Sequence, residues 1–152
     1  DVLYFEGTGE LKTDWEKWCE IQDGFPYGIQ KVVIRPGCNA IGRDVFGRGC
    51  ERITENWTNP VSVEIPETVT TIGDYAFWCC EELQSIRLPS GLVEIGGSAL
   101  EGCRSLTTLV IPDSVTEIGK DAFKDVPLII YNGPAQSDDN WGALSREEKK
   151  PE

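Results

Sequence analysis

The stretch "IPETVTTIGDYAFWCCEELQSI" at 65–86 is nearly repeated as "IPDSVTEIGKDAFKDVPLII" at 111–130. Both copies contain an Ile-Pro, an Ile-Gly and an Ala-Phe pair at the same spacing. One common reason for such repetition is that each copy is a structural unit that cannot bury its apolar side chains alone. Repetition of this kind therefore predicts an architecture and says little about chemistry.

Four Ile-Gly pairs lie at 41–42, 72–73, 95–96 and 118–119, so the intervals between them are 31, 23 and 23 residues. Aligned on these pairs, the chain contains four units, which are 31–53, 62–84, 85–107 and 108–130, with an eight-residue insertion at 54–61. The flanking segments, 1–30 and 131–152, are expected to cover the two ends of the array. At 152 residues the chain is expected to form one domain.

Each unit opens with two apolar residues separated by one position, which are Val32/Ile34, Val63/Ile65, Ile86/Leu88 and Leu109/Ile111. This alternation predicts a short strand with one face directed inward. A proline then ends the strand because it has no N–H to donate. A second apolar pair follows, and then the glycine, which we expect to adopt a backbone conformation that other residues resist. The next residues, such as "DYAF", predict a single helical or 3₁₀ turn.

A unit of the form "xxIPxxVxxIGxxAFxxCxxL" resembles the leucine-rich repeats of the BspA type (the Treponema pallidum type), found in surface and secreted proteins of bacteria and some unicellular eukaryotes. "LYFEGTGELKTDW" followed by "IQKVVIRPGCNAIG" is similar to the segment that precedes such arrays, and "IIYNGPAQSDDNWGALS" to the one that closes them. The resemblance implies a β-rich leucine-rich-repeat solenoid of short parallel strands, with about four repeats and two caps. It implies a recognition scaffold whose targets vary.

Aromatic residues are abundant in the N-terminal cap, where Trp15 and Trp18 are expected to cover the first repeat. The run "LYFEGTGELK" predicts a hairpin-like pair of strands around residues 7–9. At the other end Tyr131 and Trp141 are expected to cover the last repeat. The final "REEKKPE" (146–152) is polar and is expected to be frayed.

The composition excludes several kinds of partner. The chain has 14 basic and 26 acidic residues, a formal charge of −12, and no basic stripe, which argues against nucleic acid and anionic membranes. No apolar run approaches the roughly 20 residues that span a bilayer, so no membrane insertion is expected in this segment. Because the chain opens with Asp1 and contains no Met, it is expected to be a processed or excised segment.

The six cysteines lack the CxxC pairs of a zinc site. Cys50, Cys80 and Cys103 occupy one column of the repeat, where we expect reduced, inward thiols. Cys19 and Cys38 are a candidate disulfide that joins the N-terminal cap to the first repeat. Cys79 has no equivalent in the other repeats and is a candidate for an intermolecular bond.

An enzyme is not expected. The chain contains no histidine, the commonest general base and metal ligand, and its acidic pairs have no diagnostic spacing. Neither a metal nor another cofactor is predicted. The sequon Asn56-Trp57-Thr58 predicts a glycosylated residue if the protein passes through a secretory compartment. Together with the even cysteine count, it favours an extracellular, secreted or cell-surface protein.

The outward strand positions form two columns, which are Lys31, Ser62, Ser85 and Thr108, and Val33, Glu64, Arg87 and Val110. In solenoids this face is the usual recognition surface. We therefore expect a non-catalytic binding or adhesion module for a protein or glycan on another cell or matrix. Trp57 and Trp78, which fit a cap poorly, are candidates for a second contact site. The alternative is a structural subunit that assembles head to tail with copies of itself into a filament.

Overall fold

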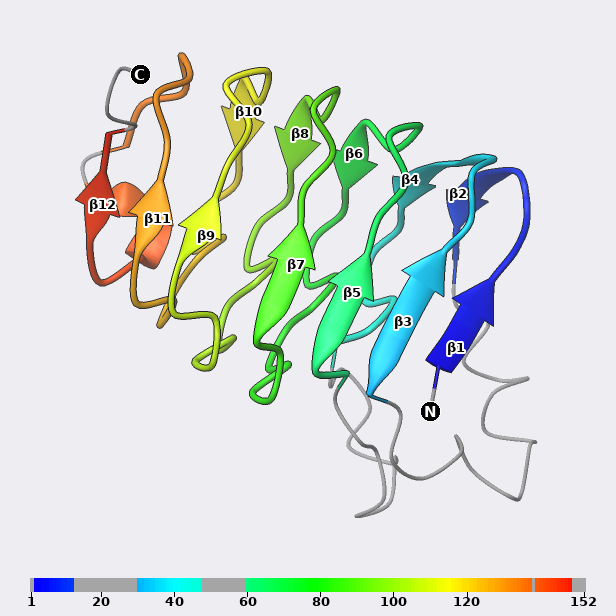
Figure 1. Cartoon of the computed structure of the whole chain (residues 1–152). Helices are drawn as coiled ribbons and strands as arrows, with labels where there is room; N and C mark the ends of the chain where they lie inside the picture. The colour runs from blue at the N-terminus through cyan, green and yellow to red at the C-terminus, as the bar shows by residue number, and fades with distance from the viewer. Residues whose placement is uncertain (1, 13–29, 48–59, 138, 149–152) are drawn as a thin grey trace.

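The computed structural model describes residues 2–12, 30–47, 60–137 and 139–148. Within these ranges the chain winds through two rows of short parallel strands (Figure 1). The strands of the front row are β1 (Val2–Phe5), β3 (Lys31–Ile34), β5 (Ser62–Glu64), β7 (Ser85–Arg87), β9 (Leu109–Val110), β11 (Ile129–Ile130) and β12 (Arg146–Glu147). Those of the back row are β2 (Gly9–Leu11), β4 (Cys38–Ile41), β6 (Thr71–Ile72), β8 (Glu94–Ile95) and β10 (Glu117–Ile118).

Every ladder in the two rows is parallel and follows the order of the repeats. The back row is one sheet of five strands, whereas the front row consists of a four-stranded sheet, β1-β3-β5-β7, and a three-stranded sheet, β9-β11-β12. The predicted leucine-rich-repeat solenoid is therefore confirmed.

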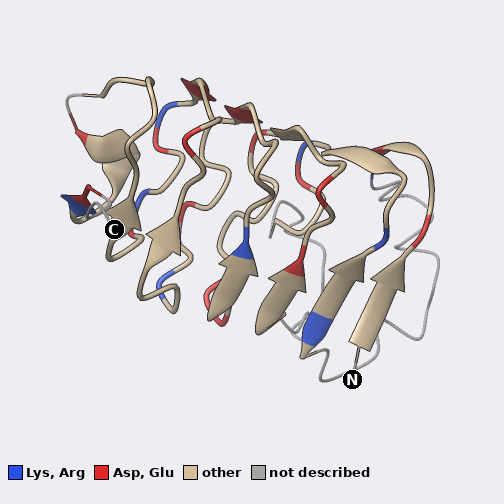
Figure 2. Cartoon of the chain, turned by 45° about the horizontal axis from the view of Figure 1, so that its top comes forward, with Lys and Arg blue, Asp and Glu red and all other residues tan. Residues whose placement is uncertain are grey.

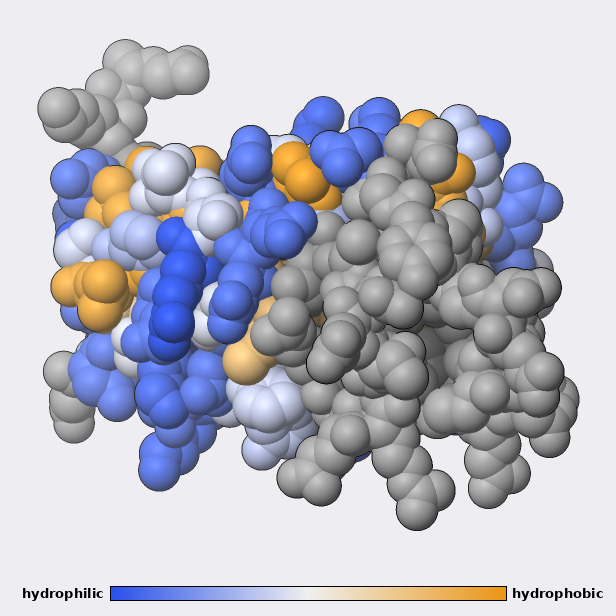
Figure 3. Space-filling model, turned by 90° about the horizontal axis from the view of Figure 1, so that it is seen from below, coloured by the Kyte–Doolittle hydropathy of each residue, from blue (hydrophilic) through white to orange (hydrophobic). Residues whose placement is uncertain are grey.

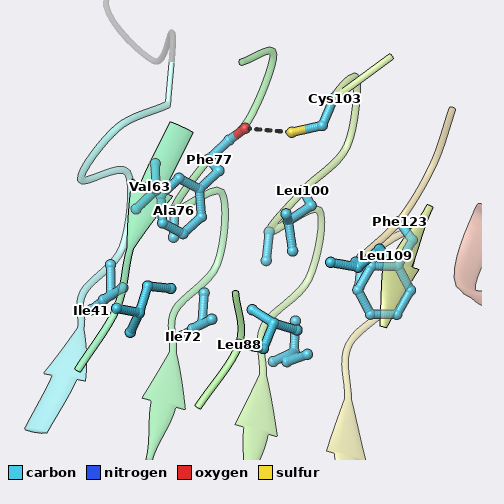
Figure 4. Close-up of a cluster of buried hydrophobic side chains, with 14 of the residues drawn as sticks. Ile41, Val63, Ile72, Ala76, Phe77, Leu88, Leu100, Cys103, Leu109 and Phe123 are labelled. Carbon is cyan, nitrogen blue, oxygen red and sulfur yellow. Dashed lines mark hydrogen bonds between the residues drawn. The ribbon is translucent and has the colours of Figure 1, made fainter. Parts of the chain in front are cut away.

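Inward side chains from both rows and from the turns fill one core (Figure 4). All of the predicted inward strand residues are buried except Ile86, which is partly buried and packs against the core. The turns contribute a column of large apolar residues: Phe46, Phe77, Leu100 and Phe123. Phe46 and Phe77 stack with ring centroids 5.1 Å apart. Each repeat therefore buries its apolar face against the next one, as the repetition indicated.

The turn after each Ile-Gly pair has alternating hydrogen bonds. The N–H groups of Trp78 and Cys80 donate to the carbonyls three residues earlier, at 3.0 and 3.2 Å, which is the 3₁₀ pattern. The N–H groups of Tyr75 and Phe77 instead donate to carbonyls of the next repeat, at 3.0 and 2.8 Å. Two positions per turn have positive φ, as at Tyr75 (57°) and Cys79 (56°). The turns are thus joined laterally, and none of the described repeats contains a continuous helix.

The glycines of the Ile-Gly pairs are required for a reason that differs from our prediction. None of Gly42, Gly73, Gly96 and Gly119 has positive φ. A Cβ at Gly96 would lie 2.4 Å from the backbone nitrogen of Asp74, and one at Gly119 would lie 2.3 Å from that of Gly97. Glycine is needed here because the backbones of adjacent repeats approach too closely for any side chain.

Two predictions about the ends were wrong. The segment around residues 7–9 is not a hairpin, because β1 pairs with β3 in the front row and β2 pairs with β4 in the back row. The tail 146–152 is not frayed from its start, since Arg146 and Glu147 form β12, which pairs with β11. The N-terminal strands thus act as an additional rung before the first repeat.

The C-terminal segment replaces the hydrogen-bond partners of a further repeat. Trp141 accepts from the N–H of Phe123 at 3.0 Å, and Ser145 accepts from the N–H of Ile129 at 3.0 Å. Tyr131 and Trp141 are buried, and Arg146 lies over both rings, with its guanidinium carbon 5.3 and 5.6 Å from their centroids. Both aromatic residues cover the last repeat as expected. Trp15 and Trp18 lie outside the described residues.

Candidate binding face

The outward columns of the front row are longer than the sequence indicated. Register places Tyr4 beside Val33, and Val2 beside Lys31. At the other end it places Ile130 beside Val110, and Glu147 beside Ile130. Seven of the described strands therefore line the front face. The face extends beyond the four strands that carry the predicted columns.

The signal for the missed residues was present in the sequence. "VLYF" at 2–5 alternates in the same way as "KVVI" at 31–34, but the aromatic residues of this region favoured a cap. In the structure Tyr4 is 51% exposed, and the guanidinium carbon of Arg35 lies 4.6 Å from the centroid of its ring. Val110, on the other side of the face, is 52% exposed. The face therefore has an exposed apolar side chain on each side of a polar centre.

The polar centre is hollowed and contains five of the eight predicted contact residues. A depression of about 580 Å³ is lined by Lys31, Ser62, Val63, Glu64, Ile65, Glu67, Ser85, Ile86 and Arg87. We call it the front-face hollow. Figure 2 shows charges of alternating sign on β3, β5 and β7, which carry Lys31, Glu64 and Arg87. Val33, Thr108 and Val110 do not line the hollow.

The ion pairs in the hollow do not join the two charged residues that lie opposite each other on neighbouring strands. Glu64 and Arg87 are opposite each other in register, as predicted. Glu64 nevertheless pairs with Lys31, at 2.5 Å, and Arg87 pairs with Glu67, at 3.9 Å. The side chain of Arg87 is 88% exposed. Its guanidinium is therefore the most accessible charge of the three on these strands.

Glu67, which the sequence analysis did not select, is held in place by the next repeat. The backbone N–H and the hydroxyl of Ser90 both donate to Glu67 Oε2, each at 2.8 Å. These bonds, with a smaller contribution from Arg87, hold the pKa of Glu67 below its usual value. Glu67 therefore remains an anion at the rim of the front-face hollow at neutral pH.

Trp78, the other predicted contact residue that the structure describes, does not line the hollow. Trp78 lies in a turn, half-buried, with its ring centroid 6.2 Å from that of Tyr75 in an edge-on arrangement. Trp57 and the sequon residue Asn56 lie outside the described residues. A second contact site at Trp57 and Trp78 stays a prediction. In the view from below, the described surface is mostly hydrophilic with separate hydrophobic patches (Figure 3).

Cys80 and Cys103 are buried, as predicted for their column. The Sγ–H of Cys103 donates to the carbonyl of Phe77 at 3.3 Å, and that of Cys80 to the carbonyl of Phe46 at 3.4 Å (Figure 4 shows the first). Cys50 lies outside the described residues. Cys38 is a buried thiol with its sulfur 3.9 Å from the carbonyl of Gly7. Because Cys19 lies outside the described residues, the Cys19–Cys38 disulfide stays a prediction, which native alkylation of Cys19 without reductant would contradict.

The thiol of Cys103 makes the fold sensitive to alkali. Burial raises the pKa of Cys103 from an ordinary 9.0 to about 12. The stability that depends on the neutral thiol is therefore complete below about pH 9 and is lost as pH rises towards 12. Between pH 7.5 and pH 10 we expect the free energy of unfolding of the wild type to fall by about 1.4 kcal/mol more than that of Cys103→Val. Urea unfolding of both proteins at the two pH values measures this difference. Valine is a suitable control because Val126 occupies this position in the fourth repeat; equal losses in the two proteins would contradict the assignment.

Cys79 occupies a strained backbone position. Its φ is 56°, and the equivalent residue of the next repeat is Gly102, with φ 78°. A left-handed backbone conformation destabilises the folded state by about 1–2 kcal/mol when the residue is not glycine. Glycine avoids this strain, but part of the gain is offset because glycine loses more conformational entropy on folding. Cys79→Gly is expected to stabilise the fold by about 0.5 kcal/mol, measured as a rise in Tm, while Cys79→Ala gives no gain. A lower Tm for the glycine variant would contradict this. The intermolecular role of Cys79 stays a prediction.

Two further properties concern only the described parts of the chain. They contain no group of three or more His, Cys, Asp or Glu residues that could hold a metal ion. They also contain no helix with the length and apolar character needed to cross a membrane.

Comparison with known proteins identifies the repeats. Residues 51–132 match the family described as "BspA type Leucine rich repeat region (6 copies)". A search of curated proteins found no match. Among solved structures, a leucine-rich cell surface protein of Faecalibacterium prausnitzii is 27% identical, with a TM-score of 0.62, and the match covers 80% of this chain and 32% of that one. A leucine-rich repeat protein of T. pallidum is 28% identical, with a TM-score of 0.57, and the match covers 68% of this chain and 48% of that one.

This chain thus spans about half of one solved neighbour and about a third of the other. Both similarities are consistent with the parallel ladders and the turn columns described above. The family match covers 82 of 152 residues, counted from 51 to 132. The chain belongs to the BspA-type leucine-rich-repeat family.

Proposed function

We propose that this chain is a non-catalytic binding module that engages a protein or glycan partner at a cell surface or in the extracellular space. The observation that supports this most is the front-face hollow, in which Lys31, Ser62, Ser85 and Arg87 present charged and hydroxyl groups. The cell-surface description of the F. prausnitzii neighbour is consistent with this location.

The polar groups of the hollow serve recognition better than stability. Exposed ion pairs contribute at most about 1 kcal/mol each, so the Lys31–Glu64 and Arg87–Glu67 pairs do little for the fold. An exposed guanidinium can form bidentate hydrogen bonds with a carboxylate or other anionic group of a partner. The exposed side chains of Tyr4 and Val110 supply apolar contacts on either side of the hollow.

The test is binding to a panel of immobilised matrix proteins and a glycan array. The variant Glu64→Ala/Arg87→Ala is expected to lose at least about tenfold in affinity for whichever target the wild type binds, with Tm unchanged. The matched control is Thr71→Ala/Glu94→Ala, which changes two adjacent outward residues of the back row. Loss of binding in the control variant but not in the front-row variant would overturn the proposal.

The filament alternative makes a different prediction for the mass in solution. Residues 139–147 already accept the N–H groups of Phe123, Ile129 and Tyr131 that a further unit would otherwise engage. We therefore expect light scattering to give the mass of one chain over a hundredfold range of concentration. A mass that climbs without a plateau would favour head-to-tail assembly, and its loss on reduction would implicate Cys79.

A further inference from the structure

The front row is interrupted between β7 and β9. Among the described strands β7 pairs only with β5, and β9 only with β11. In the preceding repeats the N–H of Ser62 donates to the carbonyl of Gln30 at 3.0 Å, and that of Ser85 to the carbonyl of Val61 at 3.3 Å. The equivalent bond, from the N–H of Thr108 to the carbonyl of Gln84, is not formed. We call this break between the two front sheets the seam.

The same two repeats remain joined everywhere else. In the back row β8 and β10 are paired in register, Glu94 with Glu117 and Ile95 with Ile118. In the turns the N–H of Ser98 donates to the carbonyl of Lys120 at 3.0 Å, and that of Leu100 to the carbonyl of Ala122 at 2.8 Å. The seam is therefore confined to the front row. The back-row ladder and the hydrogen bonds between the turns of the same two repeats are intact.

The seam leaves one inward side chain less covered than its neighbours and two strand edges without a ladder partner. Ile86 is partly buried, whereas the equivalent residues on either side, Val63 and Leu109, are fully buried. The strand edges on the two sides of the seam, β7 and β9, lack a ladder partner there. Facing rows of amide donors and acceptors above an apolar floor are the groups that recognise an extended polypeptide.

We propose that the seam binds an extended peptide, which inserts as an additional parallel strand between β7 and β9. This rests on the proposed function and specifies its ligand: a polypeptide that alternates apolar residues, directed to Ile86, with polar residues at the surface. An acidic residue on the outer side meets Arg87, whose own ion pair is long at 3.9 Å.

Insertion requires β7 and β9 to lie about 9.6 Å apart, which is two strand spacings. Opening the seam this far breaks no β-ladder in the front row, because none joins β7 to β9. The paired back-row strands β8 and β10 keep the repeats attached while the front row opens.

The existence of the seam in solution is tested by proline, which removes one N–H. Thr108→Pro is expected to leave Tm close to that of Thr108→Val, because the N–H it removes has no partner in the front row. Ser62→Pro removes a bonded N–H at the same repeat position and is expected to lower Tm by about 6 °C or more relative to Ser62→Val. Equal losses for the two proline variants would show that the front row is continuous and overturn the proposal.

Binding is tested with a fluorescein-labelled peptide of sequence VSVEIPET, which copies residues 61–68 of the chain. This peptide carries inward Val and Ile and an outward Glu, and the Glu64 it copies lies beside Arg87 in the native register. We expect saturable binding, measured by fluorescence polarisation, that Thr108→Pro weakens at least about tenfold and Thr108→Val leaves unchanged. N-methylation of the peptide at the glutamate that copies Glu64 is expected to abolish binding, because it removes a main-chain donor and keeps every side chain.

The failure of this inference is distinguishable from failure of the proposed function. If VSVEIPET does not bind, or binds equally to Thr108→Pro and Thr108→Val, the seam is not a peptide site. A target from the panel that still depends on Glu64 and Arg87 would then leave the proposed function intact. If neither the peptide nor any member of the panel binds, both are overturned.

Discussion

Gly96→Ala is expected to lower the free energy of unfolding by about 3 kcal/mol and to lower Tm by roughly 6–12 °C. The added Cβ would lie 2.4 Å from the nitrogen of Asp74 and 2.6 Å from the carbonyl carbon of Gly73. Both are backbone atoms of the preceding repeat, so the clash is relieved only by separating the two repeats. That separation would weaken the 2.7 Å bond from the N–H of Gly96 to the carbonyl of Ile72.

Gly91→Ala is the matched control for this prediction. Gly91 lies in the same repeat, is exposed and has ordinary φ, and the nearest atom to an added Cβ is the carbonyl oxygen of Glu67 at 3.9 Å. Alanine there is expected to be neutral or to stabilise by up to about 1 kcal/mol, because it restricts the unfolded chain. Chemical unfolding of both variants measures the difference. Equal stabilities for Gly96→Ala and Gly91→Ala would contradict the close approach of the repeats.

Phe77→Ala is expected to cost about 4 kcal/mol, which is a large part of the stability of a domain of this size. Phe77 is fully buried and stacks on Phe46 with an interplanar angle of 12°. Removing the ring leaves a cavity between consecutive repeats and also ends the aromatic contact, which contributes about 1 kcal/mol beyond burial. Figure 4 shows Phe77 among side chains from several strands of the core.

The chain itself supplies the control for Phe77. Leu100 occupies the same position in the third repeat and is fully buried there. Phe77→Leu keeps most of the apolar volume and is expected to cost about 1.5 kcal/mol, much less than Phe77→Ala. Urea unfolding midpoints compare the two variants. If the leucine variant were as unstable as the alanine variant, the aromatic stack rather than the filled volume would determine the stability of this column.

The repeat itself was predictable because its signals are local. A 23-residue period, a period-two alternation before each proline and a second apolar pair are all present within a single unit. Burial follows directly from such patterns, since only one face of a short strand can be directed to the core. The inward columns of Val32, Val63 and Leu109, and the burial of Cys80 and Cys103, were therefore predicted correctly.

Half of the candidate binding face was also predictable, and the rest was not. The columns through Lys31, Glu64 and Arg87 follow from the repeat alignment alone. The alternation of residues 2–5 indicates a strand, but no local pattern shows that β1 pairs with β3 or β11 with β9, and hence that Tyr4 and Ile130 continue those columns. Glu67 joins the front-face hollow through its bonds to Ser90, a residue of the next repeat.

The repeat pattern indicates which side chains are inward and that successive units stack. How closely they stack, and hence why Gly96 cannot carry a side chain, is visible only in the folded chain. The same is true of the placement of β1 and β2 in separate sheets and of the interruption of the front row between β7 and β9. All three features have one cause. Alternation is a property of one strand, whereas backbone separation and strand pairing depend on two segments about 23 or more residues apart, whose spacing no local pattern encodes.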